Sequence, residues 1–131
     1  MTDVIDLLAR GRLYRESGDP ATAARLLAEA AEAEPTARAV LTELALAQFQ
    51  SAALGPAERT ARRLVELDPS DAYAHLLLGR ALARASRHRE ALPHLRMAAA
   101  MSPSAELDDL IAASESRIVA IDEQTRHVTR R

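Results

Sequence analysis

The residues of this chain that could do acid–base or metal chemistry are few and poorly placed for it. The His-Arg-Glu segment at 88–90 matches a fragment of the zinc deaminase signature, which also needs a cysteine pair, and the chain has no cysteine. His94 lies six positions after the histidine of that segment, on a different face of a helix. Asp108 and Asp109 are adjacent, and adjacent helical side chains do not converge. We therefore expect no catalytic residue, no metal ligand and no cofactor.

Arginine provides the remaining chemistry of the sequence. All 17 basic residues are Arg, and with 19 acidic residues the net charge is -2. A guanidinium binds a carboxylate through two parallel hydrogen bonds, whereas a net charge this close to zero gives no general attraction to nucleic acid or to membranes. The arginines therefore indicate either local ion pairs or recognition of acidic groups.

A 34-residue repeat organises the chain. The prolines at Pro35, Pro69 and Pro103 are spaced 34 positions apart. Three units in register, at 4–37, 38–71 and 72–105, indicate a repeat array rather than a single irregular domain. The same spacing relates Gly11, Ala45 and Gly79, then Ala23, Ala57 and Ala91, and then Ala30, Leu64 and Ala98.

Each unit is predicted to hold two antiparallel helices, because its apolar residues recur at helical spacing and the pattern breaks once in the middle. In the first break, Asp19 is a good N-cap and Pro20 suits the first helical turn. In the second, Gly55 is predicted to end one helix and Pro56 to open the next. The third break, at 86–88, has neither Gly nor Pro. No alternating β pattern is present, so the predicted fold is all-α.

Residues 106–126 are predicted to form a seventh helix that caps the array. A repeat array exposes an apolar end unless a helix with a polar outer face covers it, and this segment is amphipathic. The basic residues 127–131 are expected to fray. The apolar side of the cap carries Leu107, Leu110, Ile111, Ile118 and Ile121, and its polar side carries Asp108, Asp109, Glu115, Asp122 and Glu123.

The three units resemble the tetratricopeptide repeat (TPR) family, whose repeat is also 34 residues long. The resemblance implies a right-handed α-solenoid of three antiparallel helix pairs followed by the capping helix. Tyr14 would be the core aromatic of the first unit, and His75 departs from the family at a position that often holds Trp. The third unit carries the family pattern at repeat positions 7, 8, 20, 27 and 32 with Leu78, Gly79, Ala91, Ala98 and Pro103.

In this family the first helix of each unit lines a concave groove, so the resemblance implies a partner-binding surface. An apolar floor flanked by arginines suits a peptide or helix with apolar anchors and acidic residues. The alternative is a solvated face with local ion pairs, such as Arg12 with Glu16. The implied groove residues are Ile5, Leu8, Arg12 and Arg15 in the first unit, Leu46 and Phe49 in the second, and Tyr73, Leu76, Arg80 and Arg84 in the third.

The sequence thus predicts a protein-interaction module, acting as an adaptor, scaffold or regulator, that is not an enzyme. Some family members bind chaperone C-termini through a Lys and Asn carboxylate clamp, but this chain has no Lys and no Asn, so that mode is not expected. Two alternatives stay open: a homodimer that buries the apolar groove residues, and nucleic-acid binding through the arginines of the groove and tail. The groove could also be filled by the chain's own tail.

The cytoplasm is the expected location of the protein. The first 18 residues are charged throughout and show no signal peptide. No apolar run approaches the roughly 20 residues that a membrane-spanning helix needs. We therefore expect no membrane partner.

Overall fold

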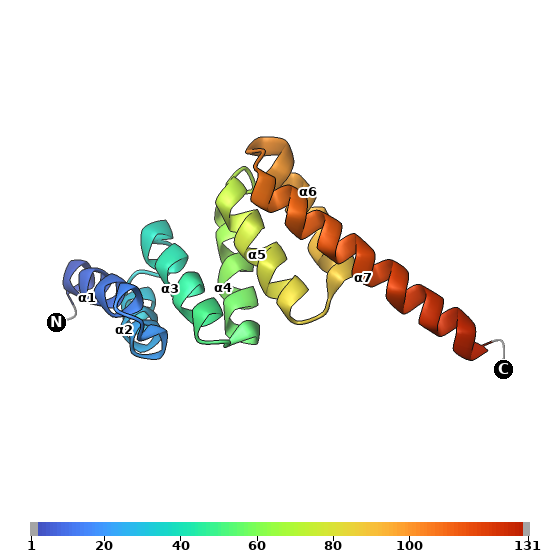
Figure 1. Ribbon diagram of the computed structural model, residues 1–131. Coiled ribbons are helices and arrows are strands. Elements are labelled where there is room, and N and C mark those ends of the chain that lie inside the picture. The colour runs from blue at the N-terminus through green and yellow to red at the C-terminus, as the bar shows by residue number, and fades with distance from the viewer. Residues whose placement is uncertain (1–2, 130–131) are drawn as a thin grey trace.

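In the part of the chain that the structure describes, seven α-helices follow one another as an elongated array (Figure 1). The computed structural model describes residues 3–129, and these contain no strand, which confirms the predicted all-α repeat fold. The helices are α1 (Val4–Glu16), α2 (Pro20–Ala33), α3 (Arg38–Gln50), α4 (Leu54–Leu67), α5 (Ala72–Arg84), α6 (His88–Met101) and α7 (Ala105–Thr129).

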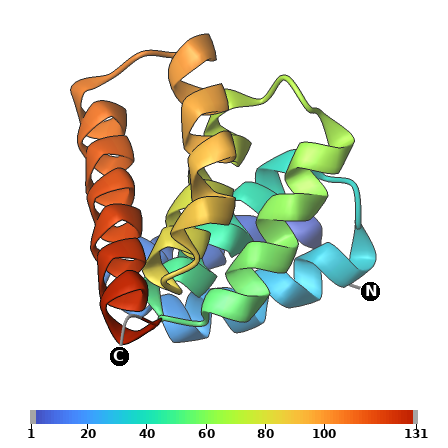
Figure 2. The ribbon, with the colours of Figure 1, turned by 90° about the vertical axis from the view of Figure 1, so that its right-hand side faces the viewer.

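The helices pack in consecutive antiparallel pairs. The pairs α1–α2, α3–α4 and α5–α6 each form a hairpin, and neighbouring pairs stack through α2 on α3 and α4 on α5. Viewed from the C-terminal end, α7 lies alongside α6 as a further layer (Figure 2). Each helix therefore buries one face against its hairpin partner and another against a neighbouring pair.

Small residues at recurring positions bring paired helices close together. Gly11 on α1 faces the side chain of Leu27 on α2, and Gly79 on α5 faces Leu95 on α6 in the same way. Leu27 and Leu95 are fully buried. Ala91, which is also fully buried, leaves room for this close approach between α5 and α6. The core is therefore built from Leu side chains set against Gly and Ala rather than from aromatic residues.

The turn inside each repeat contains one residue with a positive φ, and these residues are also 34 positions apart. They are Gly18 (φ 89°), Ala52 (φ 61°) and Ser86 (φ 63°). The prediction that Gly55 ends a helix is wrong, because Gly55 and Pro56 lie in the first turn of α4. Backbone N–H groups in a first turn have no intrahelical partner, so a proline is tolerated there.

We expect Ala52→Gly to raise the free energy of unfolding by about 0.5–1 kcal/mol. A left-handed conformation costs an L-residue roughly 1–2 kcal/mol, which exceeds the roughly 0.4–1 kcal/mol of extra chain entropy that a glycine loses on folding. Urea unfolding of the variant measures this. Ala53→Gly is the matched control, since Ala53 has a φ of -82° and no such strain. Destabilisation by Ala52→Gly would contradict the assignment of strain to this turn.

The first half of α7 covers the end of the third repeat. Leu107 is buried, and Leu110 and Ile111 are half-buried against the same core cluster. Nδ1 of His88 lies 3.0 Å from Oγ of the buried Ser114, which joins the start of α6 to the middle of α7. These contacts are those of a capping helix.

The second half of α7 projects beyond the repeats (Figure 1). Ile121, predicted on the covered side, is 49% exposed, because it lines an open pocket beside the start of α6 instead of packing against that helix. The helix also continues to Thr129, so residues 127–129, predicted to fray, are helical. Arg126 and His127 lie in the last turn, where positive charge is favourable at the C-terminal end of the helix dipole. The rest of the predicted tail, 130–131, lies outside the described residues.

Candidate functional site

Helices α1, α3, α5 and α7 line the inner side of the array. α1 packs on α3, α3 on α5 and α5 on α7, whereas within residues 3–129 the backbones of α2, α4 and α6 stay apart and only long side chains bridge them, as Arg62 of α4 does to Glu90 of α6 at 3.8 Å. An array whose first helices touch while its second helices are spread apart curves toward the first helices. The inner side is therefore concave, and we call the surface of α1, α3 and α5 on this side the groove.

A cluster of three charged side chains holds the N-terminal part of the groove. Nε of Arg12 donates a hydrogen bond to Oε1 of Glu43 at 3.0 Å, and Nε of Arg15 donates to Oε2 at 2.8 Å. Glu43 comes from α3 and is only 9% exposed. The ion pair of Arg12 with Glu16 that the sequence suggested is replaced by this contact, because stacking of the second repeat on the first brings a carboxylate within reach of both arginines.

The two apolar candidates on α1 differ in accessibility. Ile5 is 82% exposed. Leu8 is half-buried and packs against the core clusters below it, which include Leu7, Leu27 and Leu44. Only Ile5 of this pair is therefore freely available to a partner.

An aromatic ring lies beneath two guanidinium groups in the C-terminal part of the groove. Cζ of Arg80 is 4.8 Å and Cζ of Arg84 is 5.3 Å from the ring centroid of Phe49. Phe49 comes from α3 and both arginines come from α5, so this cluster exists only because the second and third repeats stack. Cation–π contact of this kind holds a guanidinium in place while leaving its N–H groups able to bind another acceptor.

Three further side chains lie between these clusters. Leu46 and Leu76 are half-buried against the main core, whereas Tyr73 is 43% exposed. Partial burial raises the pKa of Tyr73 above its usual value, although the positive charges of Arg80 and Arg15 oppose this. Tyr73 therefore stays a neutral hydroxyl at physiological pH, and it lies between the Arg15 and Arg80 sides of the groove.

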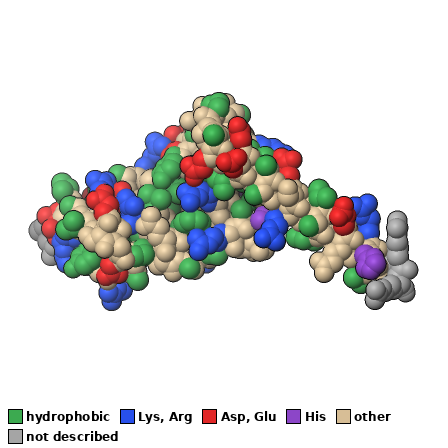
Figure 3. Space-filling view, in the orientation of Figure 1, with side chains coloured by type: hydrophobic (Ala, Val, Ile, Leu, Met, Phe, Trp, Pro, Cys, Tyr) green, Lys and Arg blue, Asp and Glu red, His purple; other side chains and the backbone are tan. Residues whose placement is uncertain are grey.

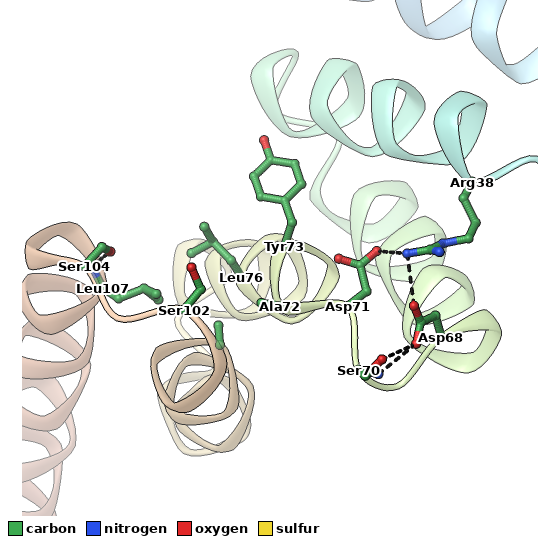
Figure 4. A pocket seen from close by; sticks show the side chains of 11 residues that line it. Arg38, Asp68, Ser70, Asp71, Ala72, Tyr73, Leu76, Ser102, Ser104 and Leu107 are labelled. Atoms are coloured by element: carbon green, nitrogen blue, oxygen red, sulfur yellow. Dashed lines mark hydrogen bonds and ion pairs between the residues drawn. The ribbon is translucent and has the colours of Figure 1, made fainter.

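A cleft of about 440 Å³ opens next to Tyr73 and Leu76, at the N-terminal ends of α5 and α7 (Figure 4). Leu107 adds to its apolar lining. On one side Nη2 of Arg38 bridges two carboxylates, at 2.8 Å from Asp71 and 3.2 Å from Asp68. An apolar lining with a polar rim is typical of a pocket for an apolar side chain.

Charge is unevenly distributed over the surface. In Figure 3, basic side chains lie among apolar ones over the middle of the molecule, where Figure 1 places α3 and α5. Acidic side chains gather above them, near the turn from α6 into α7, where the sequence holds Glu106, Asp108 and Asp109. The charges thus form local patches on a chain of nearly neutral total charge.

Comparison with known families identifies the repeats. A tetratricopeptide repeat model matches residues 14–81, just over half of the chain. The chain belongs to the tetratricopeptide repeat family. The match runs from the end of α1 into α5 and so includes the aromatic and basic cluster formed by Phe49 and Arg80.

Solved TPR structures share the fold at low sequence identity. MamA MSR-1 has a TM-score of 0.83 and 24% identity, and the match covers 96% of this chain and 73% of that one. The first TPR of Spaghetti (RPAP3), bound to the HSP90 peptide SRMEEVD, has a TM-score of 0.80, 20% identity and coverages of 88% and 95%. The TPR2B domain of yeast Sti1, in a pHsp70 complex, has a TM-score of 0.80, 18% identity and coverages of 87% and 97%.

The search of curated proteins gives no match. Within residues 3–129, none of the TPR helices combines the length and apolar character that crossing a membrane requires.

Tyr14 does not occupy the core as a TPR consensus aromatic would. Its side chain is 38% exposed, whereas Leu82, at the same position of the third repeat, is fully buried. The difference follows from how many helices pack on each: within residues 3–129, α1 contacts α2 and α3, while α5 contacts α3, α4, α6 and α7. The last turn of α1 is therefore less covered than the last turn of α5.

Glu43 is the groove residue that the sequence analysis missed. It lies 28 and 31 positions from the two arginines it binds, so no single-helix pattern points to it. The signal available was an acidic residue within the run Val40–Ala47 of the second TPR, whose other residues are apolar except for Thr42. A charged residue inside such a run needs partners when it is buried, and Arg12 and Arg15 supply them.

Two histidines meet inside the third TPR. Nδ1 of His75 and Nδ1 of His94 are 3.1 Å apart, while the ring centroids are 5.4 Å apart. The two nitrogens therefore point toward each other along the line joining the rings. Nε2 of His75 is 2.9 Å from the carbonyl oxygen of Pro69, which can only accept, so this nitrogen carries a hydrogen and Nδ1 of neutral His75 accepts from His94. The pair fastens α5, α6 and the loop between the second and third repeats.

We expect stability to decrease between pH 7.5 and 5.5 through His94. Burial lowers the pKa of His94 below 6.5, and the charges of His75 and Arg62 add to this effect. The unfolded chain then binds a proton at His94 more readily than the folded chain. The resulting stabilisation is complete above pH 6.5 and decreases as the pH falls below that value.

Urea unfolding at several pH values checks this expectation. The free energy of unfolding should fall less steeply with decreasing pH for His94→Gln than for the wild type. Met97→Gln is the control, because Met97 is 48% exposed on the same helix as His94 and does not titrate, so that variant should follow the wild-type profile. Parallel profiles for wild type and His94→Gln would show that His94 does not titrate with unfolding.

Proposed function

We propose that this chain is a cytoplasmic protein-interaction module that binds an acidic peptide or helix in the concave groove, without catalysis. The observation that supports this most strongly is the cluster of Arg80, Phe49 and Arg84 on the inner side of α3 and α5. A partner carboxylate would pair with the guanidinium groups, and apolar partner side chains would contact Ile5, Tyr73 and the adjacent cleft.

The physical chemistry of this cluster favours binding. Both guanidinium groups rest on one ring, so less side-chain freedom is lost when a ligand arrives than for two mobile arginines. Aromatic residues and arginine are also the types most enriched at energetically important positions of interfaces. Arg84 is exposed, and no carboxylate of the described residues pairs with it within 4 Å. The nearest acidic group to Arg80 is Glu106, at 3.8 Å.

The structural relatives support a peptide as the partner. The TPR domain of Spaghetti holds SRMEEVD, a peptide with three acidic residues among its last four. This chain has neither Lys nor Asn, so the acidic residues of its partner would be bound by arginine. The proposed partner is accordingly an acidic segment with apolar anchors, and it differs from the chaperone C-termini that a Lys and Asn clamp binds.

Self-association is the second candidate function. Ile5 and Leu13 are 82% and 62% exposed, and their spacing of eight residues places them on nearly the same side of α1. An exposed apolar helix face at the end of an array is suited to packing against a second copy. Sedimentation equilibrium at micromolar concentration distinguishes the two candidates by mass.

Selection from a random peptide display library tests the proposed function. The immobilised protein should enrich peptides that combine Asp or Glu with Leu, Phe or other apolar residues, and fluorescence anisotropy should then give saturable binding of these peptides to a monomer. Enrichment of no common sequence pattern, together with a dimeric mass, would favour self-association.

A further inference from the structure

We propose that Glu43 is a built-in competitor for ligand carboxylates, which makes the groove accept acidic residues at its C-terminal end only. This inference rests on the proposed function, namely that the groove binds an acidic segment. It predicts how charge is distributed along the bound partner: acidic residues lie over α5 and uncharged residues lie over α1.

Glu43 accepts hydrogen bonds from the same arginine N–H groups that a ligand carboxylate would use. Each of its two oxygens accepts a hydrogen bond from a different guanidinium, at 3.0 Å from Arg12 Nε and 2.8 Å from Arg15 Nε. The side chain of Glu43 is 11% exposed and that of Arg15 is 17% exposed, so the contact with Arg15 is shielded from water, whereas Arg12 is 48% exposed. A carboxylate gripped by two arginines is the arrangement expected of a bound acidic ligand, here supplied by the chain itself.

The opposite end of the groove has no such internal partner. Arg80 is 3.8 Å from Glu106, whose side chain is 65% exposed, and Arg84 has no ion pair among the described residues. All four arginines come from equivalent faces of α1 and α5, yet only those of α1 share a nearly buried carboxylate, to which each donates its Nε–H. The two ends therefore differ in what they offer a ligand, although their residue types are the same.

Displacing Glu43 would be unfavourable for a ligand. An incoming carboxylate that took over the two Nε–H groups would separate Glu43 from both arginines and leave it nearly buried without a partner, which cancels the gain from the new contact. Acidic ligand residues near α1 would also be repelled by Glu43 itself. Glu43 is thus a specificity-determining residue that need not touch the ligand.

A purely structural role is the competing explanation, in which Glu43 only joins the first repeat to the second. Both explanations predict that Glu43→Gln alters stability. Only competition predicts that the variant gains affinity for peptides with additional acidic residues at one end. Gln has nearly the shape of Glu and can still accept one hydrogen bond, so it releases the charge while disturbing the packing little.

The test is a parallel peptide display selection on wild type, Glu43→Gln and the control Glu66→Gln. Glu66 pairs with Arg63 on the outer helix α4, at 3.8 Å, so its replacement makes the same change of charge away from the groove. We expect Glu43→Gln to enrich peptides with acidic residues at both ends and to bind them about tenfold more tightly than wild type does. Glu66→Gln should select the wild-type set.

The outcomes separate this inference from the proposed function. If wild type and Glu43→Gln select the same acidic peptides with equal affinity, the groove function stands and the role of Glu43 is overturned. If only Glu43→Gln selects acidic peptides, the role of Glu43 is supported and the proposed function of the wild type fails. If neither selects acidic peptides, both fail.

A measurement on the wild type alone covers the case in which Glu43→Gln does not fold. The acidic peptide that binds most tightly is extended at the end that lies over α1, either by two Glu or by two Gln. That end is identified beforehand as the one whose extension is protected from proteolysis in the complex. Equal or weaker binding of the Glu extension supports competition by Glu43. A tenfold gain from the Glu extension over the Gln extension would overturn it.

Discussion

The double variant Arg80→Glu, Arg84→Glu is expected to weaken binding of the selected acidic peptide by at least about a hundredfold. Hydrogen bonds to charged groups contribute roughly 1.5–3 kcal/mol each, and two of them are replaced by repulsive contacts. The salt dependence of binding should also reverse, because added salt weakens the attraction in the wild type but screens the repulsion in the variant. Fluorescence anisotropy with the labelled peptide at two salt concentrations measures both effects.

The chain offers a matched control for this variant. Arg59→Glu, Arg63→Glu makes the same change of charge at the same spacing of four residues, on α4, outside the groove. Its affinity should stay within about twofold of wild type, and circular dichroism should show that both double variants are folded. Equal binding by the groove variant and wild type would rule out the cluster around Phe49 as the binding site.

The largest effect on stability is expected from Gly79→Val. A Cβ atom at Gly79 would lie 2.6 Å from Cδ2 and 2.7 Å from Cγ of Leu95, with the backbone nitrogen of Leu95 at 3.3 Å. Leu95 is fully buried, so neither its side chain nor the helix that carries it can move aside easily. Overpacking of this kind costs about 1–3 kcal/mol, and the two methyl groups of Val place the variant near the upper value.

Urea unfolding of Gly79→Val against Gly55→Ala measures this effect. Gly55 is exposed in the first turn of α4, and a Cβ there would meet only the Nη1 atom of Arg59, at 3.6 Å. Gly55→Ala should therefore be neutral or stabilising, since Ala favours a helix over Gly by up to about 1 kcal/mol. An unchanged unfolding midpoint for Gly79→Val would mean that α5 and α6 do not approach as closely as the structure shows.

Features encoded within one repeat were predictable from the sequence. The helix bounds follow from local signals: Asp3, Asp19 and Asp71 each accept a hydrogen bond from the backbone N–H three residues on, which starts a helix. The 34-residue spacing also carries the small residues that allow close packing. The turn in the second repeat was placed wrongly because the prediction relied on Gly55 as a helix-ending residue. The residue with positive φ is Ala52, which occupies the same repeat position as Gly18 and Ser86.

The candidate site was predictable as a set of positions and not as a set of contacts. The repeat register placed Phe49, Arg80 and Arg84 on equivalent inner faces, and the structure brings them together. It also separates the arginines into two kinds: Arg12 and Arg15 share the carboxylate of Glu43, whereas Arg80 and Arg84 lie on the ring of Phe49. That division depends on a residue between the arginines of neighbouring helices, and no pattern within a single helix reveals it.

The sequence by itself determined the period, the helices and most of the positions that they bury, with Tyr14 and Ile121 as exceptions. These follow from apolar spacing, capping residues and the recurrence of Gly and Ala, all of which act over one or two turns of chain. Only the tertiary structure decided that Glu43 binds Arg12 and Arg15, that His75 meets His94, and that α7 projects beyond the array. The contacts of Glu43 and His75 join residues 19 to 31 positions apart, and the projection of α7 depends on where its neighbouring helices lie. The stacking of whole helices determines both features.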